Sequence, residues 1–203
     1  MKHIRDVTGV ILAGGASSRF GSNKALASYD ALPLIQHVAQ PLEKLFKERL
    51  LVTNTASVYE FLGWPMVGDI HPSCGPLGGI HAALKTINTS KAFIVGCDMP
   101  LLNTDLIAHL CTLPGDWDAA LPWLKAGPEP LYAIYTKKCL PHIEQSLQSK
   151  EFKIGLLLRK LKLHKISEDD ILSQTGSLST FHNINFRQDM SLLEHAAEKA
   201  NNG

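Results

Sequence analysis

The residues with the clearest chemical potential lie in one loop near the start of the chain. Gly14 and Gly15 follow an apolar run, and Arg19 and Lys24 come a few positions later. Glycines let backbone N–H groups approach an anion closely, and guanidinium and ammonium groups pair with phosphate oxygens. The pattern is typical of a triphosphate cradle, although its spacing is neither that of a Walker A loop nor that of a dinucleotide fingerprint. An ordinary glycine-rich turn with two exposed basic residues is the alternative.

Three polar residues further along the chain each follow an apolar run. Asp98 comes after residues 92–96 and precedes Met99 and Pro100. Its carboxylate could hold Mg²⁺, which prefers oxygen ligands and shares them with substrate phosphates, or it could only cap a helix or a turn. Asn54 and Asp69 could hydrogen-bond to a base or a ribose, or could serve only in turns.

These residues need a scaffold that brings them together, and the chain predicts one. Short apolar runs alternate with segments of helical periodicity, which indicates βαβ units and a mostly parallel sheet. Ligands bind beyond the carboxyl ends of parallel strands, so we expect Gly14, Asn54, Asp69 and Asp98 to lie at one edge. The predicted strands are residues 7–12, 50–53, 65–67, 92–96, 119–121 and 131–135, and the predicted helices are residues 34–46, 75–84, 136–147, 154–159 and 187–199. Residues 165–179 are polar and are expected to be rich in loops.

The composition is that of a globular chain. The 203 residues are 45% hydrophobic and carry a net charge of +1. This excludes a mainly disordered chain and gives no charge excess for binding nucleic acid. No run is long and apolar enough to span a membrane. We expect a single α/β domain over residues 1–203.

The thiols and hydroxyls give no support for nucleophilic catalysis. Cys74, Cys97, Cys111 and Cys139 show no Cys-x-x-Cys spacing, and we expect them to be reduced in a cytoplasmic protein. No Gly-x-Ser-x-Gly elbow occurs.

Five short motifs follow one another in a fixed order. They are Leu12-Ala13-Gly14-Gly15 with Ser17, Arg19, Gly21 and Lys24; Gly75-Pro76-Leu77 with Gly79; Cys97-Asp98-Met99-Pro100; Glu129-Pro130-Leu131-Tyr132; and Asn183-Ile184-Asn185. Together they resemble the molybdenum cofactor guanylyltransferase (MobA) family of the nucleotidyltransferase superfamily. The resemblance runs from about residue 7 to residue 190 and implies a three-layer αβα sandwich of Rossmann-like character. It also implies transfer of GMP from GTP to the terminal phosphate of molybdopterin, with Mg²⁺ and release of pyrophosphate.

The resemblance also assigns roles to individual residues. Arg19, Lys24 and Asp98 are expected to be catalytic, with Asp98 as the metal ligand. About residues 1–110 would bind GTP, and about residues 111–203 would face molybdopterin. The expected GTP contacts are Leu12, Ala13, Gly14, Gly15, Lys24, Asn54, Asp69 and Asp98, and the expected molybdopterin contacts are Gly79, Asn183 and Asn185. Gly14 favours GTP, because cytidylyl-transferring relatives tend to have alanine there.

The chain departs from the family pattern on the acceptor side. The family commonly has Gly-x-Arg near residue 150, where this chain has Lys150-Glu151-Phe152-Lys153, and Phe186 follows Asn185 where the family often has threonine. Three alternatives therefore stay open: cytidylyl transfer to molybdopterin, nucleotidyl transfer to a sugar phosphate, and a catalytically silent adaptor that binds GTP and molybdopterin. Transient contact with molybdenum-insertion proteins and apoenzymes is a further expectation.

Overall fold

A central sheet organises the computed structural model, which describes residues 3–14 and 23–184. The strand order across the sheet is β10-β7-β9-β6-β1-β4-β5, and β8 pairs with β7. The strands are β1 (Val7–Leu12), β4 (Arg49–Val52), β5 (Met66–Val67), β6 (Lys91–Gly96), β7 (Ala119–Leu124), β8 (Gly127–Pro128), β9 (Tyr132–Thr136) and β10 (Leu163–Ser167). A separate hairpin joins β2 (Ser28–Tyr29) to β3 (Leu32–Pro33).

The sheet is mostly parallel, as the sequence predicts. Strands β6, β1, β4 and β5 are neighbours and run in the same direction, and β10 runs parallel to β7. Strand β9 is antiparallel to both β6 and β7. Its first residue, Tyr132, therefore pairs with Val95 near the carboxyl end of β6.

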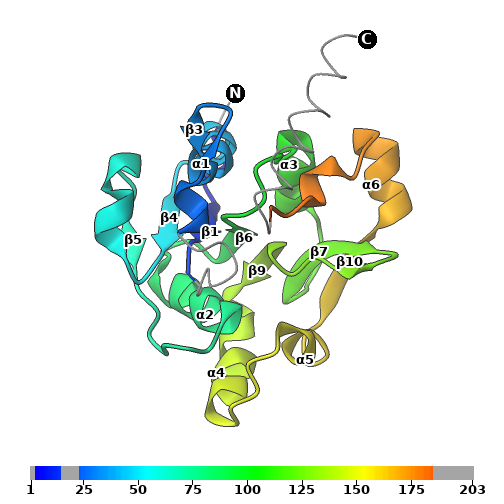
Figure 1. Ribbon diagram of the computed structural model, residues 1–203. Helices are drawn as coiled ribbons and strands as arrows, with labels where there is room; N and C mark the ends of the chain where they lie inside the picture. Colours follow the sequence, from blue (N-terminus) through cyan, green and yellow to red (C-terminus); the bar gives the residue numbers. More distant parts are fainter. Residues whose placement is uncertain (1–2, 15–22, 185–203) are drawn as a thin grey trace.

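Helices cover both faces of this sheet, which confirms the three-layer αβα sandwich. Figure 1 shows α1 and α3 on one side of the strands and α2, α4 and α5 on the other. The α-helices are α1 (Leu34–Leu45), α2 (Pro76–Thr86), α3 (Thr104–Thr112), α4 (Leu140–Gln148), α5 (Ile154–Leu158) and α6 (Glu168–Thr175). The 3₁₀ helices are η1 (Lys24–Leu26), η2 (Ala56–Leu62), η3 (Lys137–Cys139) and η4 (Ser179–Phe181).

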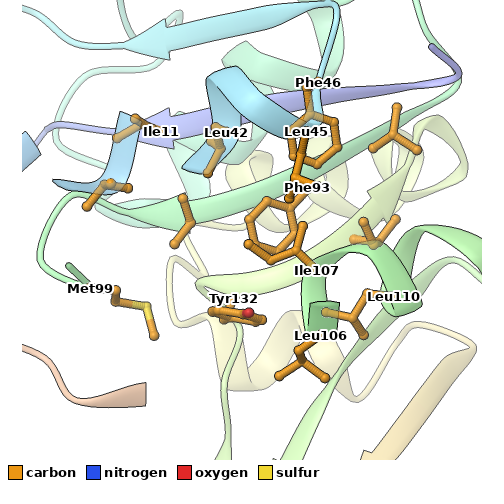
Figure 2. Close-up of a cluster of buried hydrophobic side chains, with 14 of the residues drawn as sticks. Ile11, Leu42, Leu45, Phe46, Phe93, Met99, Leu106, Ile107, Leu110 and Tyr132 are labelled. Atoms are coloured by element: carbon orange, nitrogen blue, oxygen red, sulfur yellow. The ribbon is translucent and has the colours of Figure 1, made fainter. Parts of the chain in front are cut away.

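Alternate residues of each central strand enter different cores. In β6, Phe93 and Val95 belong to the core beneath α1 and α3, whereas Ala92 and Ile94 belong to the core beneath α2 and α4. Successive side chains of a strand point to opposite faces of the sheet. Because helices cover both faces, the buried residues of the strand are all apolar and do not alternate with polar ones. An aromatic row crosses the first core, in which Phe46 stacks on Phe93 and Phe93 meets Tyr132 edge-on (Figure 2).

Most predicted elements are confirmed, with boundaries that shift by up to four residues, because β7 extends to Leu124 and α4 begins only at Leu140, after η3. The expectation of a loop over residues 165–179 is wrong, because β10 and α6 cover most of that segment. β10 lies at the sheet edge, and α6 buries only Ile171, so neither has a clear apolar period. Helix α3 is not among the predicted elements, although its cap Asn103 accepts a hydrogen bond from the Leu106 N–H at 2.9 Å. The predicted helix over residues 187–199 lies outside the described residues.

No helix among residues 3–14 and 23–184 is both long and apolar enough to cross a membrane. The four cysteines are all free.

Strand β1 depends on a glycine where helix α1 ends. A Cβ atom built on Gly9 would lie 2.5 Å from the ring of Phe46, which is fully buried. Only glycine lets the aromatic ring pack directly on the strand backbone.

We expect Gly9→Ala to lower the free energy of unfolding by about 2 kcal/mol, because the ring must shift in a close-packed core. In a chain of this size, that corresponds to a fall in Tm of about 4–8 °C. Gly155→Ala in α5 is the matched control, because nothing lies within 4 Å of its Cβ position. Thermal unfolding of both variants measures the difference. Equal Tm values would show that Phe46 relaxes without cost.

A buried histidine lies between α2 and α4. His81 is 3% exposed, and neither ring nitrogen makes a hydrogen bond. Its nearest charged partner is Glu144, whose Oε1 lies 3.5 Å from Nε2. Burial lowers the pKa of His81, and this outweighs the opposing influence of Glu144.

The lowered pKa predicts a loss of stability in mild acid. Above the ordinary histidine pKa, His81 is neutral in both the folded and the unfolded chain. As the pH falls through that value towards the folded pKa, only the unfolded chain takes up the proton, so the free energy of unfolding decreases. We expect Tm to fall less for His81→Leu than for wild type between pH 7.5 and pH 5.5. His109→Gln, at an exposed position of α3, should behave as wild type. Parallel pH profiles for wild type and His81→Leu would contradict the assignment.

Candidate functional site

The carboxyl edge of four neighbouring parallel strands collects the polar residues that the sequence singles out. Gly14 follows β1, Asn54 follows β4, Asp69 follows β5 and Asp98 follows β6. The strand order places β1 between β6 and β4. The predicted convergence is therefore confirmed, and within it the side chains form two pairs on either side of Gly14.

The first pair joins Asn54 to Asp69. The Asn54 Nδ2 donates to Asp69 Oδ2 at 2.9 Å, and the Asp69 backbone N–H donates to Asn54 Oδ1 at 2.8 Å. A Cβ atom on Gly68 would lie 3.1 Å from Asn54 Oδ1, so glycine leaves room for this close approach. Asn54 is exposed, so its remaining hydrogen-bonding capacity is open to a ligand.

The second pair joins Lys24 to Asp98. The Lys24 Nζ donates to Asp98 Oδ2 at 3.1 Å, and the two side chains are 14% and 28% exposed. Attraction between such partly buried charges is stronger than in bulk water. A positive charge and a carboxylate at the end of a buried strand can bind a phosphate and a metal ion side by side.

Three contacts hold Asp98 at this position. Met99, which follows it, is 1% exposed and enters the core (Figure 2). The Ile184 N–H donates to the Asp98 carbonyl at 2.9 Å. A Cβ atom on Gly96 would lie 2.5 Å from Asp98 Oδ1, so the carboxylate folds back over the end of β6.

The donor set around Asp98 suits a magnesium ion that is bound together with phosphates. The described residues contain no group of three or more histidines, cysteines or carboxylates that could enclose a metal. Mg²⁺ is commonly held by one or two carboxylates, with water and substrate phosphates completing its shell. Asp98 is accessible enough to be such a ligand.

Glu129 is a carboxyl group near Asp98 that is not among the predicted site residues, although it lies in the Glu129-Pro130-Leu131-Tyr132 motif. The antiparallel β9 starts at the carboxyl edge, and Glu129 precedes it by three residues. Burial, and then the charge of Asp98, raise the pKa of Glu129. Glu129 thus adds a second carboxyl group on the side of Asp98 away from the Asn54 pair.

The other expected site residues fall into different positions. The Ala13 N–H donates to the Val52 carbonyl at 2.9 Å, and the Leu12 carbonyl accepts from the Cys97 N–H at 3.2 Å. Both backbone groups are therefore already hydrogen-bonded to neighbouring chain segments. Gly79 is buried, and its Cβ position lies 3.2 Å from Leu12 Cδ2, which lets α2 approach β1 closely.

The C-terminal motif reaches the same edge from far along the chain. Asn183 is exposed and adjoins Ile184, the residue that binds the Asp98 backbone. Gly15, Arg19 and Asn185 lie outside the described residues.

The cysteine beside Asp98 is not an activated nucleophile. Burial raises the pKa of the Cys97 thiol to about 12, and the Asp98 charge adds to this effect. A thiol with such a pKa stays protonated at neutral pH. The site therefore offers charge stabilisation and positioning of substrates.

Comparisons with known proteins show the family to which the chain is similar. The family model for the MobA-like NTP transferase domain matches residues 9–164. A molybdenum cofactor guanylyltransferase from Desulfosudis oleivorans is 35% identical over 94% of this chain and 95% of its own length. A probable molybdenum cofactor guanylyltransferase from Pelotomaculum thermopropionicum is 32% identical over 97% of this chain and 96% of its own length.

Solved structures share the fold. The crystal structure of molybdopterin-guanine dinucleotide biosynthesis protein A from Archaeoglobus fulgidus has a TM-score of 0.81 and 24% sequence identity, and the match covers 95% of this chain and 99% of that one. A putative protein from Aquifex aeolicus has a TM-score of 0.74 with 24% identity, over 87% of this chain and 92% of that one.

Proposed function

Because the chain belongs to the MobA-like NTP transferase family, we propose that it transfers GMP from GTP to the terminal phosphate of molybdopterin. The product is molybdopterin guanine dinucleotide, and pyrophosphate leaves. The observation that carries this proposal is the Lys24–Asp98 pair at the end of β6, with Asn54 and Asp69 across the same edge.

The chemistry is an in-line displacement at the α-phosphorus of GTP. An oxygen of the terminal molybdopterin phosphate forms the new P–O bond. The bond to the bridging oxygen breaks, and its electron pair leaves with pyrophosphate. Such a transfer depends on the alignment and neutralisation of charge more than on an acid or a base.

Each pair has a separate part in this step. Lys24, with Arg19, binds the β- and γ-phosphate oxygens and stabilises the charge that develops on pyrophosphate. Asp98 would hold Mg²⁺, which supplies charge neutralisation at the phosphates when bound. Asn54 and Asp69 hydrogen-bond to the nucleoside part of GTP, and Gly14 and Gly15 let the backbone approach it.

The acceptor would lie on the Glu129 side of Asp98. We assign about residues 1–110 to GTP and about residues 111–203 to molybdopterin, within one domain. Gly79, Asn183 and Asn185 belong to the acceptor side. Molybdenum-insertion proteins and apoenzymes are proposed as transient partners in the cytoplasm.

A nucleotide series tests the guanylyl assignment. We expect GTP with Mg²⁺ to raise Tm more than CTP, ATP or UTP at the same concentration, because the stabilisation of the folded chain by a ligand increases with its affinity. We also expect pyrophosphate release with molybdopterin and GTP. Greater release with CTP would favour the cytidylyl alternative, and binding without release would favour the silent adaptor.

A single substitution tests the role of Asp98. We expect Asp98→Ala to lower kcat by on the order of a hundredfold or more, because the metal-held stabilisation of charge is lost. Its Tm should stay close to that of wild type, since the side chain lies at the sheet edge. Asp116→Ala is the matched control, because that carboxylate pairs with Lys138 and Lys162 on an exposed surface. Near-normal turnover of Asp98→Ala would leave Asp98 as a turn residue only.

A further inference from the structure

A buried tyrosine carries a hydroxyl group that packing alone does not explain. Tyr59, in η2, is 1% exposed and lies in the core beneath α1. Phenylalanine would fill nearly the same volume without burying a polar group, which is costly unless the group is hydrogen-bonded. The hydroxyl therefore needs a partner that makes use of it.

That partner is Asn23, 36 residues away along the chain. The Asn23 Nδ2 donates to the Tyr59 hydroxyl at 2.9 Å, and the hydroxyl donates to Asn23 Oδ1 at 3.1 Å. The same Oδ1 accepts from the Ala25 N–H at 3.2 Å and so caps η1. Asn23 thus ties η1 to η2 with its whole amide group.

The residue between Asn23 and Ala25 is Lys24. Ala25 is 2% exposed and anchors η1 in the core, while Asn23 secures its first turn. The Lys24 backbone is therefore held on both sides. Its side chain reaches Asp98 from this fixed base.

Helix η2, which carries Tyr59, begins close to the Asn54–Asp69 pair along the chain. η2 starts at Ala56, two residues after Asn54. The Asn23–Tyr59 hydrogen bonds thus join the segment that follows β4 to the segment that carries Lys24. Burial raises the pKa of Tyr59, so the hydroxyl keeps its proton throughout the neutral range.

We propose that Tyr59 and Asn23 are positioning residues of the transfer reaction, which hold Lys24 where it meets the GTP phosphates opposite Asp98. This inference rests on the proposed function. Neither residue is assigned a contact with substrate, and their effect passes through Lys24 alone. A shift of about 1 Å in a charged group that aligns a reaction can cost up to a hundredfold in rate.

Tyr59→Phe removes only the hydroxyl. We expect kcat/KM for GTP to fall about tenfold, with Tm only a few degrees lower. Thr8→Val is the matched control. Thr8 is 3% exposed, and its hydroxyl forms a hydrogen bond with the Thr89 hydroxyl at 2.7 Å, near the end of β1 that is opposite the site. We expect this control to lower Tm in a similar way and to leave kcat and KM unchanged. Similar kinetics for both variants would overturn the positioning role.

A conservative variant separates the hydrogen bonds from the packing. Asn23→Asp keeps an oxygen that accepts from both Tyr59 and Ala25, so its kcat/KM should stay within about threefold of wild type. Asn23→Ala removes both contacts and should lose at least as much activity as Tyr59→Phe. A loss in Asn23→Asp as large as in Asn23→Ala would overturn the inference.

The decisive measurement is a double-mutant cycle with Lys24→Ala. If Tyr59 acts through Lys24, Tyr59→Phe should change kcat/KM by less than about twofold in the Lys24→Ala background. An undiminished effect there would show that Tyr59 acts by another route. Wild-type kinetics in Lys24→Ala, or no pyrophosphate release by wild type, would instead overturn the proposed function, so the two failures are distinguishable.

Discussion

The parallel pairing of β6, β1, β4 and β5 is the constraint on which the site depends. Leu12 pairs with Gly96 on one side and with Val52 on the other. Neighbouring strands lie about 4.8 Å apart, so the residues just beyond these strand ends form one row. Chain segments that are far apart in sequence are thereby held side by side at one edge of the sheet.

Close packing on both faces keeps β1 in this row. On one face Gly9 meets the ring of Phe46, and on the other Leu12 meets Gly79 of α2. Each glycine removes a side chain that would push a helix or an aromatic ring away from the strand. The cores beneath α1 and α2 are thus part of the positioning of the site, although none of their side chains needs to touch a ligand.

The edge of this rigid sheet separates two kinds of chemistry. Asn54 and Asp69 pair a neutral amide with a carboxylate, which suits hydrogen bonding to a ligand. Lys24 and Asp98 form an ion pair, which suits phosphates and a metal ion. The hydrogen bonds between Asn23 and Tyr59 connect the two regions. The geometry therefore provides binding, alignment and charge stabilisation, which is what transfer of a nucleotidyl group requires.

The sequence by itself determined the strands whose burial is complete, the mostly parallel α/β sheet and the placement of Gly14, Asn54, Asp69 and Asp98 at strand ends. These follow from local patterns, because apolar runs and helical periods report the burial of each segment separately. Elements with few buried residues, such as β10 and α6, carried too weak a pattern.

Only the tertiary structure decided which distant side chains meet. The antiparallel course of β9 brings Glu129 towards Asp98, and the packing of η2 brings Tyr59 to Asn23. No periodicity encodes either the electrostatic influence of Asp98 on Glu129 or the Asn23–Tyr59 hydrogen bonds, because both depend on strand order and on how the connecting segments cross the sheet edge. The partners of Lys24 and Asp98 were therefore beyond the reach of local patterns, even though both residues stand out in the sequence.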